Sequence, residues 1–435
     1  MKQSTIDAIR AAHDTFLREL NKAPIPQEGH WVYERGTDGS WRGAFVLRPS
    51  TYGLLAPHEP FIERLSSEMS PVLVADYPDH MKGVGLPGVG IAILQPRMIL
   101  GVLAYETLRR YGTFAINHDQ MEDLLDDVAG FFDRPNIRVR LSAPLLNLHG
   151  SREVPPIAFP GDIIMRPITD EEVTSFYGGN PIFNTGSRLL AFPSFLFVRE
   201  VDVPKVVGDF SKIANESFWR PTQEMFDRLI LAISSFKDGG PIGYDGVRVT
   251  PVEMAFGATS GGQFGSSEHV PVGHYELTPE EAPRLELYAK LFEDIHPSLE
   301  IACQRLVDAT RRTKVRDSIV DAVIGLESIL LVEVGEKQRS ETRFRFSLNY
   351  ASLFPVEERH DAFHTARDLY DLRSLIAHGG EPSSKQKING NDMALHQIAP
   401  LARSVLRETL ARFMPNSAKP HFLSNGYWVT KVLGL

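Results

Sequence analysis

The segment 370–380 carries the two side chains of this sequence that are best suited to phosphodiester chemistry. Arg373 and His378 lie five residues apart, near the end of a helical pattern. A histidine can move a proton near neutral pH, and an arginine can bind phosphate oxygens as negative charge builds on them. Such a pair can cleave a phosphodiester without a metal ion. A structural interpretation stays open, in which His378 ends the helix and Gly379 provides a left-handed cap.

The spacing of this pair bears on how a site could form. Five residues correspond to about 140° around an α-helix, so Arg373 and His378 do not share one helix face. A second copy of the helix in a symmetric dimer would complete the site. We therefore expect a homodimer that forms through this part of the chain.

Glu327 interrupts an otherwise apolar helix face formed by Val323, Leu326 and Leu330. A carboxylate in such a place must be paired, because an unpaired buried charge is strongly destabilising. We expect Glu327 to hold Arg373 in place. The alternative interpretation is a plain structural ion pair, and the two roles are compatible.

Basic residues gather at two places in the same part of the chain. They are Arg305, Arg311, Arg312, Lys314 and Arg316 at the first, and Lys337, Arg339, Arg343 and Arg345 at the second. Solvated helix faces are one interpretation of these clusters. The other is an electrostatic track that binds an RNA backbone. The candidate RNA-binding residues are Arg311, Arg312, Arg316, Arg343 and Arg345.

The elements that must position these side chains show a helical period. Segment 278–281 is typical of a helix start, because it combines a threonine cap, a first-turn proline and two acids. Helices are predicted at about 279–294, 298–312, 315–334, 339–353, 358–378 and 391–413. The pattern predicts an all-α bundle over 279–415. The tail 416–435 is rich in apolar residues and should pack on the body.

The first 270 residues predict an α+β region of one or two subdomains. Helices are predicted at 4–22, 119–132, 169–176 and 221–236, and strands at 44–47, 71–75, 137–141, 163–165, 196–198 and 246–250. The glycine- and serine-rich run 257–267 is typical of a linker or loop. Segment 271–278 is predicted to link the two parts of the chain.

The composition excludes several classes of protein. There are 55 acidic and 46 basic residues, which gives a net charge of −9. This charge argues against a protein that coats nucleic acid stoichiometrically, and it leaves a local basic site open. The single cysteine, Cys303, permits no intrachain disulfide, and no Cys/His spacing indicates zinc. Acids in segment 118–127 predict a solvated face, so we expect neither a metal nor a cofactor.

The sequence also bears on localisation. The N-terminal residues lack the apolar core of a signal peptide. The longest apolar stretch, 89–104, is interrupted by Gln95, Pro96 and Arg97, which is incompatible with a membrane span. We therefore expect a cytoplasmic protein without a membrane partner.

Two motifs together resemble a known family. The stretch Val320-Asp-Ala-Val-Ile-Gly-Leu-Glu-Ser-Ile-Leu-Leu331 precedes Tyr370-Asp-Leu-Arg-Ser-Leu-Ile-Ala-His-Gly379 by about 40 residues, and the combination resembles the HEPN superfamily, most closely its Apea-like branch. The resemblance covers roughly residues 279–413. It implies a dimeric helical bundle that, in active members, is a metal-independent endoribonuclease. It places the motif arginine at Arg373, the following polar residue at Ser374 and the motif histidine at His378.

The resemblance further implies a toxin or antiviral-defence role, in which the N-terminal region recognises an unknown trigger or partner. Under this hypothesis RNA is the substrate, Arg373 and His378 are catalytic, and Ser374 and Glu327 support them. The alternative hypothesis is a non-catalytic module that dimerises or binds nucleotide or RNA. In that case His378→Ala would change little.

Overall fold

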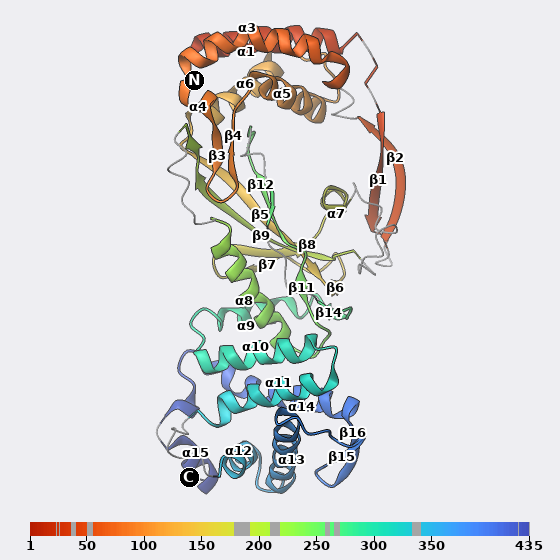
Figure 1. The fold of residues 1–435 in the computed structure, drawn as a ribbon, viewed down its shortest axis with the longest axis vertical. Helices are drawn as coiled ribbons and strands as arrows, with labels where there is room; N and C mark the ends of the chain where they lie inside the picture. The colour runs from red at the N-terminus through yellow and green to blue at the C-terminus, as the bar shows by residue number, and fades with distance from the viewer. Residues whose placement is uncertain are drawn as a thin grey trace.

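The structure is a computed structural model with a mixed α/β fold (Figure 1). It describes residues 1–22, 24–25, 27–35, 41–49, 55–177, 192–208, 218–256, 262–264, 270–332, 341–424 and 426–434. Figure 1 shows an elongated arrangement with N-terminal helices at one end, sheets in the middle and the C-terminal helices at the other end. The predicted run 257–267 lies outside the described residues except for 262–264.

Four long helices form the N-terminal end of the molecule. They are α1 Gln3–Leu20, α3 Glu59–Asp76, α5 Pro96–Tyr111 and α6 His118–Asp133, with the short α4 Pro78–Lys82 and a 3-10 turn at Ala56–His58. Helix α1 buries one apolar stripe that includes Ile9, Phe16 and Leu20, and it packs against α3, α5 and α6. Asn117 begins α6 by accepting a hydrogen bond from the Gln120 backbone N–H at 2.9 Å, while the Gln120 side chain accepts one in return.

The predicted strand at 71–75 is wrong, because these residues lie inside α3. Leu65, Met69 and Leu73 recur every four residues and are all buried, which fixes a helical register. Pro71 lies on the exposed side of this helix. The local preference of valine for strands is thus overruled by a helical stripe that extends over several turns. Helix α5 was also not predicted, since the sequence pattern there was considered only as a membrane span.

An antiparallel sheet forms the middle of the molecule. Its strands run in the order β13-β12-β5-β9-β8-β7, and β11 also pairs with β5. They are β5 Asn136–Leu146, β7 Ile157–Phe159, β8 Ile163–Pro167, β9 Phe195–Pro204, β11 Gly243–Tyr244, β12 Val247–Pro251 and β13 Gly262–Phe264. The predictions at 137–141, 163–165, 196–198 and 246–250 are confirmed. Helix α8 Arg220–Phe236 packs on this sheet, where the Phe226 and Phe197 rings stack with centroids 5.1 Å apart.

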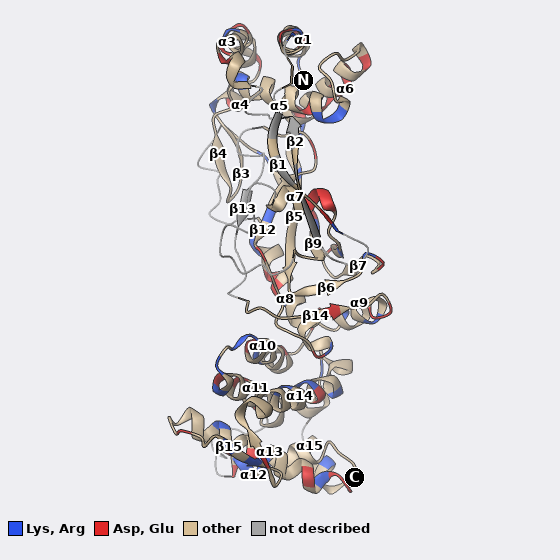
Figure 2. Cartoon of the chain, turned by 90° about the vertical axis from the view of Figure 1, so that its right-hand side faces the viewer, with Lys and Arg blue, Asp and Glu red and all other residues tan. Residues whose placement is uncertain are grey.

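Smaller sheets and one short helix complete this half of the chain. They are β1 Gln27–Arg35 with β2 Trp41–Pro49, and β10 Val206–Val207 with β3 Val84–Leu86 and β4 Gly90–Ala92, beside α7 Asp170–Tyr177. Helix α7 contacts β1, and a small second core of buried side chains lies there, including Tyr33, Val173 and Tyr177. Figure 2 shows the acidic residues of α7 gathered on its surface.

The segment predicted as a linker, 271–278, contains a strand. Here β14 Tyr275–Leu277 pairs in parallel with β6 Leu148–Gly150. The Tyr275 hydroxyl donates a hydrogen bond to the Ile233 carbonyl of α8 at 2.7 Å, and the side chain is 1% exposed. Glu281, which follows β14, forms an ion pair with Lys237, with Nζ and Oε2 2.6 Å apart. The connection between the sheet and the C-terminal helices is therefore held by packed and paired residues.

The C-terminal part consists mainly of helices, as the sequence predicts. They are α9 Ala282–Lys290, α10 Pro297–Arg311, α11 Val315–Leu330, α12 Thr342–Ala351, α13 Arg359–Ala377, α14 Leu395–Phe413 and α15 Tyr427–Leu433. Helices α10, α11 and α14 pack together, and α13 packs against α11 and α12 (Figure 1). Cys303 is fully buried in α10.

The expectation of an all-α region needs one correction. Strands β15 Lys385–Ile388 and β16 Asn391–Ala394 form a hairpin, and α14 begins only at Leu395. Asn389 and Gly390 form its turn with φ of 48° and 77°. An Asn-Gly pair adopts such positive φ values readily and closes two-residue hairpins. The Asn-Gly pair therefore indicates a hairpin in the sequence. The helical pattern of the following residues led instead to the prediction of a helix from residue 391.

One core connects most of the molecule. Its buried side chains extend from Ile9 in α1 to Trp428 in α15. In the C-terminal segment Phe422 is 0% exposed and Trp428 is 4% exposed, and both rings contact Phe413 of α14. Among the described residues, no helix is both long and apolar enough to span a bilayer.

Candidate active site

Helix α13 positions both residues of the predicted pair. Its buried residues Ala362, Ala366, Leu369 and Leu372 recur every three or four positions and hold one face against α11 and α12. The burial of these four side chains fixes which face of the helix is turned toward the protein. Every residue on the helix therefore has a defined direction, including Arg373, which follows Leu369 by one turn.

The end of α13 is a Schellman motif. Gly379 has a φ of 79° and donates its N–H to the Ile376 carbonyl at 3.0 Å, and Gly380 donates its N–H to the Leu375 carbonyl at 2.9 Å. The predicted left-handed cap at Gly379 is thus confirmed. His378 occupies the last position before it, and its N–H donates to the Ser374 carbonyl at 3.1 Å.

Arg373 is fixed by Glu327 of α11. The Arg373 Nη2 donates a hydrogen bond to the Glu327 Oε2 at 2.9 Å, and the two side chains are 24% and 19% exposed. The expected contact between these residues is present. Burial raises the pKa of the Glu327 carboxyl, and the nearby Arg373 guanidinium opposes that rise without cancelling it.

Two buried polar atoms of this ion pair lack a hydrogen-bond partner in the part of the chain that the structure describes. Glu327 Oε1 and Arg373 Nε are buried without a hydrogen-bond partner among the described residues. The ring of Tyr370 lies 5.2 Å from that of Phe346, and burial followed by the charge of Glu327 raises the pKa of the Tyr370 hydroxyl. Arg373 therefore keeps hydrogen-bond capacity that the protein does not use, since a guanidinium has five N–H donors.

His378 and Ser374 have a different environment from Arg373. The His378 side chain is exposed, and it forms no hydrogen bond or ion pair with the residues that the structure describes. Ser374 is partly buried, and its carbonyl, rather than its hydroxyl, is the group that contacts His378. The structure brings Arg373 and Glu327 together, whereas His378 lies about 1.4 turns further along at the solvent-exposed helix end.

The structure gives the arginines of the predicted RNA track different partners on different elements. Arg311 is turned toward the sheet, where its Nη2 donates to the Ile242 carbonyl at 2.8 Å. Arg312 donates to Asp321 at 2.7 Å, and Asp321 also pairs with Arg305. All three arginines thus have partners within the protein, while 47% of the Arg312 side chain stays exposed.

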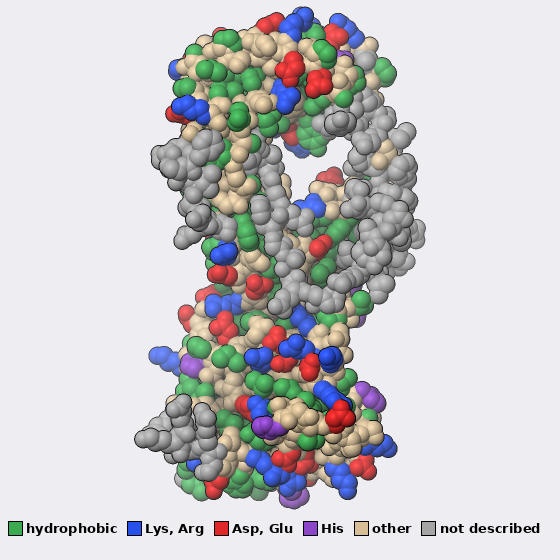
Figure 3. All heavy atoms as spheres, in the orientation of Figure 1, with side chains coloured by type: hydrophobic (Ala, Val, Ile, Leu, Met, Phe, Trp, Pro, Cys, Tyr) green, Lys and Arg blue, Asp and Glu red, His purple; other side chains and the backbone are tan. Residues whose placement is uncertain are grey.

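The remaining arginines of the predicted track lie on separate elements. Arg343 of α12 pairs with Asp371 of α13, and Arg345 on the same helix is also engaged by the protein. Arg316 at the start of α11 has its Nη1 3.8 Å from Glu381. Lys337 and Arg339 lie outside the described residues. Figure 3 shows basic and acidic side chains intermixed on the visible face of this region.

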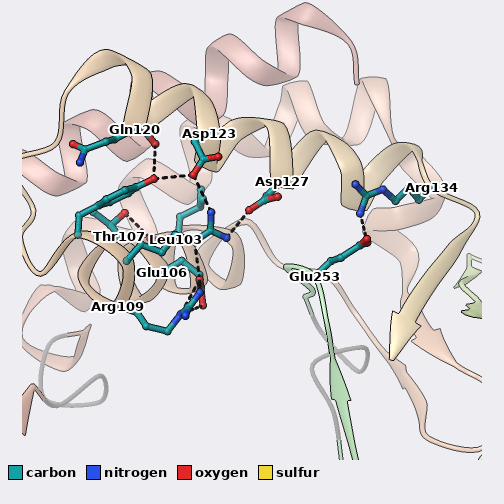
Figure 4. A network of polar contacts seen from close by, with 11 residues as sticks. Leu103, Glu106, Thr107, Arg109, Gln120, Asp123, Asp127, Arg134 and Glu253 are labelled. Atoms are coloured by element: carbon teal, nitrogen blue, oxygen red, sulfur yellow. Dashed lines mark hydrogen bonds and ion pairs between the residues drawn. The ribbon is translucent and has the colours of Figure 1, made fainter. Parts of the chain in front are cut away.

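Three of the acids near the start of α6 pair with arginines. Asp123 and Asp127, both labelled in Figure 4, pair with Arg110 of α5. Glu122 pairs with Arg10 of α1. These contacts tie three helices together. Across the described ranges, no group of three or more His, Cys, Asp and Glu side chains is arranged to hold a metal ion.

Comparison with protein-family models finds no match to this chain, and comparisons with curated proteins and with solved structures find none either.

Proposed function

We propose that the C-terminal helical region is a metal-independent endoribonuclease whose site lies at the end of α13. The observation that supports this most is the exposed His378, which a Schellman motif holds at the end of a well-packed helix while its imidazole stays uncommitted within the described residues. A histidine held in this way can approach an RNA chain from solution. Arg373 lies on the same helix, and its Nε–H forms no hydrogen bond with the described residues.

The residues divide the chemistry between them. His378 removes the proton from the ribose 2′-hydroxyl, or donates one to the leaving 5′-oxygen. Arg373 binds the scissile phosphate and stabilises the charge that builds on its oxygens. Glu327 orients the guanidinium through its 2.9 Å hydrogen bond. The products are a 2′,3′-cyclic phosphate and a 5′-hydroxyl.

A second copy of α13 completes this site. Arg373 faces α11 and His378 faces solvent, so the two side chains of one chain do not converge on one phosphate as they stand. Two chains that meet at the ends of their α13 helices would bring one chain's His378 toward the other's Arg373. In this arrangement the N-terminal helices and sheets serve as a sensor, and the protein acts as a toxin-like effector.

The test is cleavage of end-labelled total RNA and tRNA by the full chain in EDTA. Wild type should cut and leave cyclic-phosphate ends, and His378→Ala should lower the rate by about 10²-fold or more. Arg373→Lys should also slow cleavage, since lysine cannot grip phosphate with a fork of donors. His360→Ala is the matched control, because His360 lies on the same helix with a side chain 79% exposed. If the wild-type protein leaves the RNA uncut, the proposal is refuted.

A non-catalytic assembly or binding module is the second candidate. The observation in its favour is that the Arg373–Glu327 ion pair and the Schellman motif each explain one residue of the pair by structure alone. Under this candidate His378→Ala and Arg373→Lys leave every RNA property unchanged. Oligomeric state, measured by light scattering, would then be the relevant readout.

A further inference from the structure

A cavity of about 780 Å³ lies beside the last turn of α13. Four segments that are far apart in the sequence line it, namely the starts of α11 and α14, the end of α13 and the β15–β16 hairpin. The lining residues are Lys314, Val315, Arg316, Asp317, Ile376, Ser384, Ala394, Leu395 and His396. This volume is in the range of small-molecule sites. Of these residues, only Arg316 belonged to the predicted site.

The polar side chains around this cavity are largely uncommitted. Lys314, Ser384 and His396 are exposed and form no side-chain hydrogen bond or ion pair within the part of the chain that the structure describes. Arg316 is 3.8 Å from the carboxylate of Glu381, which is 87% exposed and therefore easily displaced. Asp317 adds one negative charge at the rim. Two permanent cations, Lys314 and Arg316, thus stand beside two acids, Asp317 and Glu381, and one histidine.

The floor of the cavity is apolar. Val315, Ile376, Ala394 and Leu395 are all partly buried there, and they present a surface on which a flat ring can lie. The first turns of α11 and α14 add to the positive character of the rim. Neither N-cap residue, Lys314 nor Ala394, has a side chain that can accept a hydrogen bond from those turns. The cavity therefore combines an apolar floor with an edge on which Lys314, Arg316 and His396 can donate hydrogen bonds.

This combination matches a nucleotide, which has one flat apolar face and one anionic group. We propose that the cavity binds a single nucleotide unit, with its phosphate held by Lys314, Arg316 and His396 and its base lying on Ile376 and Leu395. The role of this site rests on the proposed function. Ile376 is two residues before His378, so RNA held in the cavity would pass the end of α13, where cleavage takes place.

The test is binding of the four ribonucleoside 3′-monophosphates to the full chain, measured by calorimetry in EDTA. Wild type should bind, and the double variant Lys314→Ala/Arg316→Ala should bind at least about tenfold more weakly, because each charged hydrogen bond contributes roughly that factor. Arg18→Ala, which removes an arginine of α1 whose side chain is 73% exposed, should bind like wild type. Circular dichroism would confirm that the variants fold.

Two outcomes would overturn the inference. Wild type that binds none of the nucleotides has no such site, and a double variant that binds as well as wild type has its site elsewhere. Inorganic phosphate that binds as tightly as a nucleotide would overturn the role of the apolar floor.

The experiment also separates this inference from the proposed function. Nucleotide binding without any RNA cleavage would refute the nuclease and leave the nucleotide site standing. Cleavage that is lost in His378→Ala, together with a double variant whose nucleotide affinity is unchanged, would refute only the cavity.

Discussion

The Glu327–Arg373 ion pair should respond very unequally to the removal of its two partners. Both side chains are mostly buried, with 19% and 24% exposed, and burial of Glu327 raises its pKa despite the guanidinium 2.9 Å away. The carboxylate is therefore the group that destabilises the fold at neutral pH. Glu327→Gln should change the free energy of unfolding by less than about 1 kcal/mol, because glutamine has the same shape but no charge to desolvate.

Arg373→Met should have a much larger effect. It leaves the Glu327 carboxylate buried without a counter-ion, which costs about 3 kcal/mol at neutral pH. In the double variant the same arginine substitution should cost little, since no carboxylate remains. The coupling energy between the two positions should thus be about 2 kcal/mol, as expected for a hydrogen bond between charged groups.

The pH dependence has a definite sign. A carboxyl whose pKa is raised in the folded state binds protons more readily there than in the unfolded chain, so stability falls as pH rises through that pKa. Wild type should therefore lose stability relative to Glu327→Gln between mildly acidic and neutral pH. The defect of Arg373→Met should shrink at acidic pH, where Glu327 becomes neutral.

Urea unfolding of the four proteins, followed by far-ultraviolet circular dichroism, measures these differences. The exposed cross-strand pair Arg138–Asp202, with side chains 53% and 56% exposed and an N···O distance of 3.1 Å, is the matched control. It should show no measurable coupling. If Glu327→Gln proved as damaging as Arg373→Met, the argument that burial dominates this pair would be wrong.

Three further predictions concern packing, the helix end and pH. Gly325→Ala should lower stability by about 1–3 kcal/mol in urea unfolding, because the new Cβ would lie 2.7 Å from Leu406 Cδ2 in the core. Gly379→Ala should cost about 1–2 kcal/mol at a φ of 79° and lower the RNA cleavage rate, and Gly379→Asn should be milder in both assays. Burial holds the pKa of His13 at about 3 instead of 6.5, so stability is full above pH 6.5 and falls as pH drops toward 3. His13→Gln should flatten this acid dependence of the melting temperature, and an unchanged profile would contradict it.

Local patterns predicted much of the C-terminal half. The recurrence of apolar residues along α10, α11, α13 and α14 depends only on the helical period, so it is legible in the sequence. The end of α13 was predictable for the same reason, because Gly379 supplies a positive φ that few other residues tolerate. The choice of Arg373, His378 and Glu327 as a group came from residue type and from a family resemblance.

Errors arose where two local signals competed. Segment 71–75 has residues that favour strands, yet α3 continues through it, since Ile62, Leu65 and Met69 have already set its buried stripe. The Asn389–Gly390 turn was overlooked beside a strong helical pattern. In both places the element that forms is the one whose residues the surrounding fold can bury or pair.

Residue types and periodicity identify the side chains suited to phosphodiester chemistry and the helices that carry them. Which of these groups meet depends on tertiary packing. Glu327 contacts Arg373, which lies 46 positions away in the sequence, and Arg311 donates to the Ile242 carbonyl, a partner that no spacing rule identifies. The cavity beside α13 draws its lining from four separate segments. The reason is that periodicity fixes the direction of a side chain on its own helix, whereas its neighbours depend on how the helices pack.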